Sequence, residues 1–131
     1  MPLVKLSLCL ACLLLFGCKS IQLEPVKIDV SGLSIRPCDP KAVTRLPPEQ
    51  RSLVCYQVAG QARNGSTRSL RNINLYGIIR DVEGTTLKEG RVGGLPDLDN
   101  GKRVPFNLRV FFTRVPREPL KLEAFRAKGM T

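Results

Sequence analysis

The sequence has no histidine and no tryptophan, and acidic residues occupy only 11 of its 131 positions. Without histidine, Ser-His and Cys-His catalysis are excluded, and a metal would have to be held by carboxylates or thiolates alone. The tightest acidic cluster, Asp97, Asp99 and Asn100, lies beside a turn and offers fewer oxygen ligands than calcium requires. The glycine-rich segment 90–94 lacks the Gly-Lys-Ser/Thr of a phosphate-binding loop. We therefore expect no metal, no cofactor and no catalytic residue.

Basic residues outnumber acidic ones by 21 to 11, which gives the chain a formal net charge of +10 at pH 7. Such a surplus favours anionic neighbours such as phospholipid head groups, acidic polysaccharide or nucleic acid. The cations are spread without a block of five or six, so nucleic acid is not the expected partner. The candidate anion contacts are the arginines around two predicted turns: Arg63, Arg68, Arg71 and Arg80. A solvated basic surface without a specific ligand is the simpler alternative.

One continuous apolar run stands out, from Leu6 to Phe16, directly after Lys5. A positive residue followed by about eleven apolar ones is typical of a signal peptide, and the run is shorter than the roughly 20 residues that span a membrane. It ends in Leu15-Phe16-Gly17-Cys18, which resembles the lipobox of bacterial lipoproteins. This resemblance implies that residues 1–17 are a cleaved lipoprotein signal peptide and that Cys18 becomes the lipidated, palmitate-bearing first residue.

The same resemblance implies a membrane-anchored protein outside the cytoplasm. Residues 18–24 are expected to form a lipidated tether, and residues 25–131 a single folded domain. Lys19 follows the cysteine in place of the aspartate associated with inner-membrane retention, so the periplasmic face of the outer membrane is the expected location. The alternative is a buried N-terminal helix in which the cysteine is incidental.

The rest of the sequence is dominated by β-strand patterns. Apolar and polar residues alternate in six segments: 26–35, 53–63, 73–79, 85–92, 104–112 and 120–124. In the first segment the apolar residues stand at even-numbered positions before Gly32 and at odd-numbered positions after it, which predicts a bulge at Gly32. Segments 37–48 and 93–102 are expected to be loops, with turns at 64–66 and 81–84. The strictest alternation, over 104–112, predicts a central strand, and we expect no helix after the leader. These patterns indicate an antiparallel all-β sandwich or barrel.

Core and turn residues in the middle of the chain form a recognisable series. They are Tyr56-x-Val58-x-Gly60-x-x-x-Asn64, Leu70-x-x-Ile73-x-Leu75, Ile79-x-Asp81-x-x-Gly84, Leu98-x-x-Gly101 and Phe106. The series is similar to the FxLYD domain of bacterial and archaeal surface proteins and lipoproteins. It departs from that family at Ile79 and at Arg80, where the name-giving tyrosine would stand. The resemblance implies an immunoglobulin-like β-sandwich of about six to seven strands, located outside the cytoplasm and without an established catalytic site.

Cysteine usage points to an oxidising compartment. Cys9 and Cys12 lie in the predicted leader, so Cys38 and Cys55 are the only free thiols that remain after processing. An even number of cysteines in an oxidising space indicates a disulfide, which would join the proline-rich loop to the second strand. Closing a loop of this length should stabilise the fold by about 3 kcal/mol in the chain-entropy model. Two unpaired cysteines are the alternative.

Three functional readings follow from these features. The first is a lipid-anchored, non-catalytic module that binds or helps to assemble another envelope protein. Its candidate contacts alternate with the inward-facing residues of their strands and are therefore expected on the outward face: Tyr76, Ile78 and Phe111. These side chains could instead be covered by loops or by the second sheet. The second reading is a polyanion-binding or membrane-surface-binding module that uses the basic face. The third is an enzyme, which would need a carboxylate pair that the sequence does not display.

Overall fold

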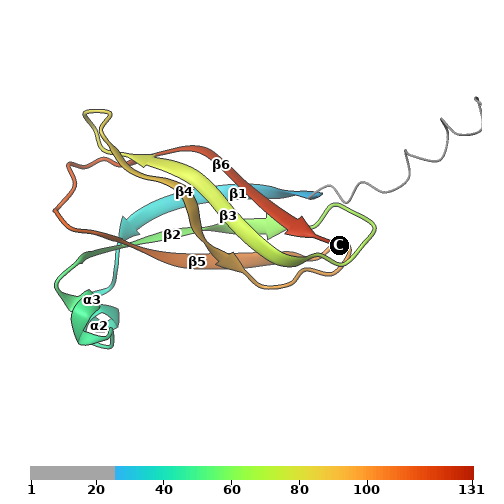
Figure 1. The fold of residues 1–131 in the computed structure, drawn as a ribbon, viewed down its shortest axis with the longest axis horizontal. Coiled ribbons are helices and arrows are strands. Elements are labelled where there is room, and N and C mark those ends of the chain that lie inside the picture. Colours follow the sequence, from blue (N-terminus) through green and yellow to red (C-terminus); the bar gives the residue numbers. More distant parts are fainter. Residues whose placement is uncertain (1–25) are drawn as a thin grey trace, which may run out of the picture.

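The computed structural model describes residues 26–131, which form six strands and two four-residue helices (Figure 1). The predicted signal peptide, Cys18 and the tether lie outside the described residues. In chain order the elements are β1 (Val26–Pro37), α2 (Pro40–Val43), α3 (Pro48–Arg51), β2 (Val54–Arg63), β3 (Arg71–Arg80), β4 (Thr86–Leu95), β5 (Arg103–Phe112) and β6 (Lys121–Met130). Neither helix is long and apolar enough to cross a membrane.

The strands form one antiparallel sheet, in the order β4-β3-β6-β1-β2-β5, that folds over into two layers. Strand β1 belongs to both layers, because Val26–Ile28 pair with β6 whereas the residues from Asp29 to Pro37 pair with β2. The pairing of β1 with β2 changes register between Ser31 and Ser34 of β1, and Gly32 in this interval has a φ of +62°. The predicted bulge at Gly32 is therefore confirmed, and bulges of this kind bend a strand. The predicted antiparallel all-β sandwich of about six strands is confirmed as well.

The core lies between the layers and follows the strand alternation. In β3, positions 73, 75, 77 and 79 are buried, and the residues between them are only half-buried. From the other layer, β2 and β5 add buried residues: Val58, Ala62, Phe106, Val110 and Phe112. At Gly77 the ring of Phe125 occupies the space that a side chain would need. The two layers are thus held together by one continuous apolar core.

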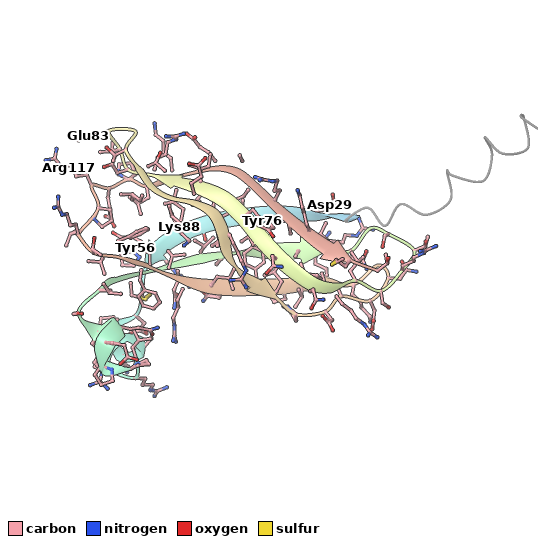
Figure 2. The ribbon with its side chains drawn as sticks, in the orientation of Figure 1. Asp29, Tyr56, Tyr76, Glu83, Lys88 and Arg117 are labelled. Carbon is pink, nitrogen blue, oxygen red and sulfur yellow. A yellow bond between two sulfur atoms is a disulfide. The ribbon has the colours of Figure 1, made fainter. Side chains whose placement is uncertain are left out.

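The strands run lengthwise, so the domain has two ends. At the N-terminal end lie the start of β1 and the loops 64–70 and 96–102. At the distal end lie α2, α3, the β3–β4 turn and the β5–β6 connection 113–120. In Figure 2, Asp29 lies near the N-terminal end, whereas Glu83 and Arg117 lie at the distal end.

The two loops of the N-terminal end are joined by Asn64, which is fully buried. Its amide nitrogen donates to the carbonyl oxygens of Arg68 at 2.7 Å and Leu98 at 3.0 Å. Its side-chain oxygen accepts from the backbone N–H of Ser66 at 2.9 Å and from the Ser66 hydroxyl at 2.7 Å. Leu70 and Leu98 add a pair of backbone hydrogen bonds between the same loops. One amide side chain therefore satisfies polar groups from two segments that are far apart in the sequence.

Three expectations about individual segments are wrong. Strand β5 was expected to be central, but it lies at an edge of the sheet. The prediction failed because alternation shows only that one face of a strand is covered, and not how many strands lie beside it. Segment 37–48 is not wholly loop, since α2 lies within it and α3 begins at its end; both helices have proline in the first turn. Strand β4 continues through Gly93 to Leu95, where a loop was expected, because Leu95 pairs with Ile73 and is buried.

Candidate interaction site

The distal end carries a first hollow of about 410 Å³ where β1 ends, β2 begins and the β5–β6 connection passes. It is lined by Ile35, Arg36, Pro37, Tyr56, Glu118, Pro119 and Leu120. The Tyr56 ring is buried, and its hydroxyl donates to a carboxylate oxygen of Glu118 at 2.6 Å. Burial raises the pKa of Tyr56 to about 12, and the hydrogen bond and negative charge of Glu118 act in the same direction. The hollow thus combines apolar walls with one fixed polar pair.

The raised pKa of Tyr56 gives a direct spectroscopic prediction. In a Tyr76→Phe variant, Tyr56 is the only tyrosine left, so the ultraviolet absorbance of tyrosinate should rise with a midpoint near pH 12. Replacing Glu118 by alanine removes the acceptor and the charge, so the midpoint should fall but stay above 10, because burial is the largest cause. A midpoint at 10 in the Tyr76→Phe variant would contradict the buried, hydrogen-bonded phenol.

The same shift sets the direction of a stability change. The pKa of folded Tyr56 lies above the ordinary value of 10.0, so between pH 10 and about 12 the folded protein binds more protons than the unfolded chain. The contribution of the neutral phenol is therefore fully present below pH 10 and is lost as the pH rises through the folded-state pKa. The difference in the free energy of unfolding between wild type and Tyr56→Phe should therefore become smaller as the pH rises from 10 to about 12.

A second hollow, of about 320 Å³, opens between the beginning of β4 and the end of β5. It is lined by Thr86, Leu87, Phe111, Phe112, Thr113 and Arg114. Strands β4 and β5 are the two edges of the sheet and contact each other without ladder hydrogen bonds. Farther along, Leu108 of β5 packs over Gly93 of β4 and narrows this seam. The rings of Tyr56 and Phe112 lie 5.7 Å apart, so the two hollows are neighbours across one aromatic pair.

A disulfide fixes the helical segment at the same end. Cys38 and Cys55 are bonded, with their Cα atoms 5.4 Å apart, so the predicted disulfide is confirmed. The N–H of Cys38 also donates to the carbonyl oxygen of Cys55 at 3.0 Å. Leu46 is buried against the two cysteines, and Phe111 packs on this small cluster from β5. Because the cysteines are 17 positions apart in the sequence, the bridge should stabilise the fold by about 3 kcal/mol.

The three predicted partner contacts do not form one surface. Tyr76 and Ile78 are half-buried on the outward side of β3, where Tyr76 lies below the guanidinium of Arg126, 5.7 Å from the ring centre. Ile78 is flanked by Glu89 on β4 and Glu123 on β6. Phe111 lies on β5, in the other layer, and is partly covered by the disulfide cluster. Of the three, Phe111 lines the second hollow, and Tyr76 and Ile78 line neither of the two.

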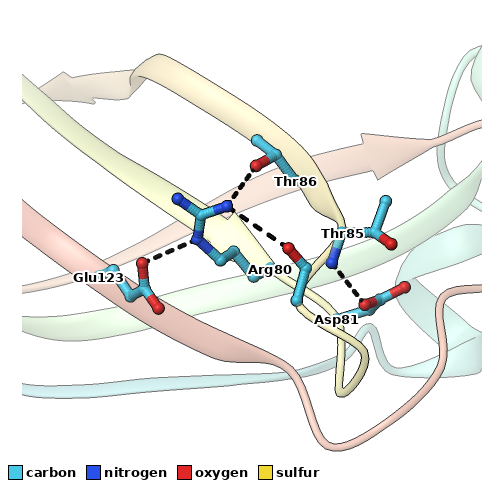
Figure 3. A network of polar contacts seen from close by, with 6 residues as sticks. Arg80, Asp81, Thr85, Thr86 and Glu123 are labelled. Carbon is cyan, nitrogen blue, oxygen red and sulfur yellow. Dashed lines mark hydrogen bonds and ion pairs between the residues drawn. The ribbon is translucent and has the colours of Figure 1, made fainter.

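The four predicted anion contacts are also split. Arg80 lies at the distal end, where its Nε donates to Glu123 at 2.8 Å and its Nη1 to the Thr86 hydroxyl at 2.7 Å (Figure 3). This arginine closes the β3–β4 turn together with Asp81, whose carboxylate accepts from the Thr85 N–H at 2.9 Å. Arg80 therefore lies at a different turn from the other three predicted anion contacts. Arg63, Arg68 and Arg71 remain together at the N-terminal end, roughly 30 Å away along β3.

Sequence reasoning missed the residues that shape the first hollow. The sequence analysis names Tyr56 only within the series of core and turn residues, and it does not single out Glu118. The two are 62 positions apart, and their contact depends on how the β5–β6 connection crosses the end of β2. No local pattern predicts such a contact.

Between residues 26 and 131, no group of three or more acidic or cysteine side chains is placed to hold a metal ion.

Neither a protein-family model nor a curated protein matches the sequence. Among solved structures, the chain is similar to a protein of Bordetella pertussis that bears the name ApaA. The similarity covers 83% of this chain and 98% of that one, with a TM-score of 0.43 and 16% sequence identity. A similarity at this level supports no statement about the function of this chain.

Proposed function

We propose that this chain is a lipid-anchored protein of the bacterial envelope that binds a protein partner through its distal end, without catalysis. The lipobox-like segment ending at Cys18 supports the anchor, and Lys19 after it supports the periplasmic face of the outer membrane. The FxLYD-like series from Tyr56 to Phe106 supports an extracytoplasmic module. The disulfide is consistent with an oxidising compartment.

The observation that carries the proposal is the position of the two hollows. Both lie at the distal end, whereas the chain enters the domain from Cys18 at the N-terminal end. A tethered domain therefore points these two hollows away from the membrane, whereas a third hollow of about 350 Å³ opens on the side of the domain, beside Gln57, Asn107, Leu108 and Arg109. The walls of the two distal hollows combine aromatic and aliphatic side chains with a few charged groups, which is the usual composition of binding sites for protein segments and small ligands.

The sheet edges themselves are guarded against pairing with a partner strand. Lys88 of β4 pairs with the fully buried Ile79 of β3, so its half-buried side chain lies on the inner face (Figure 2). An inward charge on an edge strand disfavours the approach of another strand, and Pro105 removes a backbone donor from β5. We therefore place the partner in the hollows and not along the edges.

Site-specific photo-crosslinking in intact cells tests the proposal. A photoreactive phenylalanine analogue at Leu120 reports on the first hollow, and the same analogue at Thr113 reports on the second. Controls carry the analogue at Gln61, on the side of the domain, and at Thr67, at the N-terminal end. Both controls are exposed. We expect one adduct of discrete mass from a distal position and none from the two controls.

Formation of the adduct should also depend on the apolar wall of the hollow in which the partner binds. For an adduct formed at Thr113, a Leu87→Glu change should abolish the adduct, because it places a charge in the apolar wall of the second hollow. For an adduct formed at Leu120, an Ile35→Glu change does the same in the first hollow. Equal adducts from all four positions, or none from the distal pair, contradict the proposal.

A further inference from the structure

Five exposed cationic side chains surround the N-terminal end of the domain. Arg63 ends β2, Arg71 begins β3 and Arg103 begins β5, so three of the six strands have an arginine as their terminal residue at this end. Arg68 and Lys102 lie in the two loops that Asn64 joins. All five side chains are exposed to solvent.

The positive charge at this end is not neutralised within the described part of the chain. Arg63 lies directly across from Arg103 on β5, where like charges repel each other, and across from the oppositely charged Asp29 on β1. Both ion pairs found among residues 26–131, Arg80–Glu123 and Arg117–Glu83, lie at the distal end. Three acidic residues, Asp29, Asp97 and Asp99, reduce the positive charge of the N-terminal end without cancelling it. Asp99 is itself bonded to the Ser69 hydroxyl.

The same end is the one nearest to the proposed lipid. Strand β1 begins at Val26, eight residues after Cys18. Eight residues span at most roughly 26–29 Å when fully extended, and about 16 Å on average as a flexible chain. The distal end is farther from the lipid by the length of a ten-residue strand, roughly 30 Å. Electrostatic attraction to a membrane decays over about 8 Å at physiological salt, so the distal end would experience it only if the domain turned down onto the bilayer.

We propose that the N-terminal end is a membrane-contact surface that binds the anionic head groups of the bilayer to which the protein is anchored. The inference rests on the proposed lipidation of Cys18, which places this end at a lipid surface. The loops 64–70 and 96–102 carry no aromatic side chain, so the stacking platforms of single-stranded nucleic-acid binders are missing from them. Contact at this end holds the domain upright, with both hollows directed away from the bilayer.

Vesicle co-sedimentation tests the surface without the lipid anchor. The processed chain from residue 18 onward, carrying Cys18→Ser, is mixed with vesicles of phosphatidylcholine alone or of phosphatidylcholine with phosphatidylglycerol. We expect binding only to the vesicles that contain phosphatidylglycerol, and a loss of most of it between about 0.1 and 0.5 M salt. Replacing Arg63, Arg71 and Arg103 by glutamine should weaken the binding tenfold or more.

A charge-matched variant at the other end provides the control. Lys41→Gln, Arg45→Gln and Lys121→Gln remove the same charge from exposed distal positions and should change vesicle binding less than twofold. The thermal midpoints of both triple variants are measured to show that each is folded. Equal losses in the two variants, binding that persists at high salt, or no binding to phosphatidylglycerol overturns the proposal. Labelling of wild type, but not of Cys18→Ser, with radioactive palmitate tests the anchor separately, so the two failures are distinguishable.

Discussion

Replacing Asn64 by aspartate is expected to be among the most damaging single changes in this domain, with a loss of about 3–5 kcal/mol in the free energy of unfolding. The change keeps the oxygen that accepts from Ser66 but removes the amide that donates to the carbonyls of Arg68 and Leu98. In its place it sets a carboxylate against two carbonyl oxygens at a fully buried position. Such a loss is a large part of the stability of an ordinary domain.

The Asn64→Asp variant should also acquire a characteristic pH dependence. Burial and the two carbonyls raise the pKa of the new carboxyl in the folded state above that in the unfolded chain. The folded variant then binds more protons than the unfolded one between these two values, so its stability falls as the pH rises through them. The difference in thermal midpoint from wild type should therefore be smaller at about pH 4 than at pH 7.

The exposed Asn100 provides the matched control for that experiment, because it lies in the joined loop 96–102 and carries the same side chain. Asn100→Asp should change the thermal midpoint by no more than about 2–4 °C at either pH. If the two aspartate variants have equal midpoints, Asn64 does not join the loops as described.

A second large loss of stability is expected from Gly77→Ala. A β-carbon at this position would lie 2.7 Å from the Cγ of Phe125 and closer still to two other ring atoms. The base of an aromatic ring cannot swing aside as the tip of a flexible chain can, so the ring must leave its place in the core. Forcing extra volume into a packed site costs typically 1–3 kcal/mol, and we expect about 3 kcal/mol here, measured by denaturant unfolding.

A double-mutant cycle identifies the cause of that loss. If the methyl group collides with Phe125, Gly77→Ala should cost little in a Phe125→Ala background, with a coupling energy of about 2 kcal/mol or more. Gly65→Ala is the control, because a β-carbon there meets only an ordinary contact with Asp29 at 3.6 Å. Additive effects of Gly77→Ala and Phe125→Ala would show that the ring is not the obstacle.

The strands and the disulfide could be predicted because their signals are local. Alternation over a single strand shows which face is covered, and two cysteines in an oxidising compartment usually form a disulfide. The bulge at Gly32 was predictable for the same reason, since a change of parity within one segment is visible in the sequence alone.

The distal end could not be predicted because it is built from contacts between distant segments. The pairs Tyr56–Glu118 and Arg80–Glu123 are separated by 62 and 43 positions, and strand order decides whether their members meet. Some of the missed local structure did leave signals. Pro105 within the most regular strand is typical of an edge, and Asp39 followed by Pro40 is typical of the beginning of a helix.

Strand β1 has a mechanical consequence for a protein held by its N-terminus. A pull on the chain at Val26 runs along β1, between its two neighbours, and so loads its ladder hydrogen bonds together and not one after another. One residue past the end of β1, the bond between Cys38 and Cys55 passes the load covalently into β2. In the proposed anchored state, tension between the membrane and a partner at the distal end would therefore act on the ladder hydrogen bonds of β1 and on this disulfide.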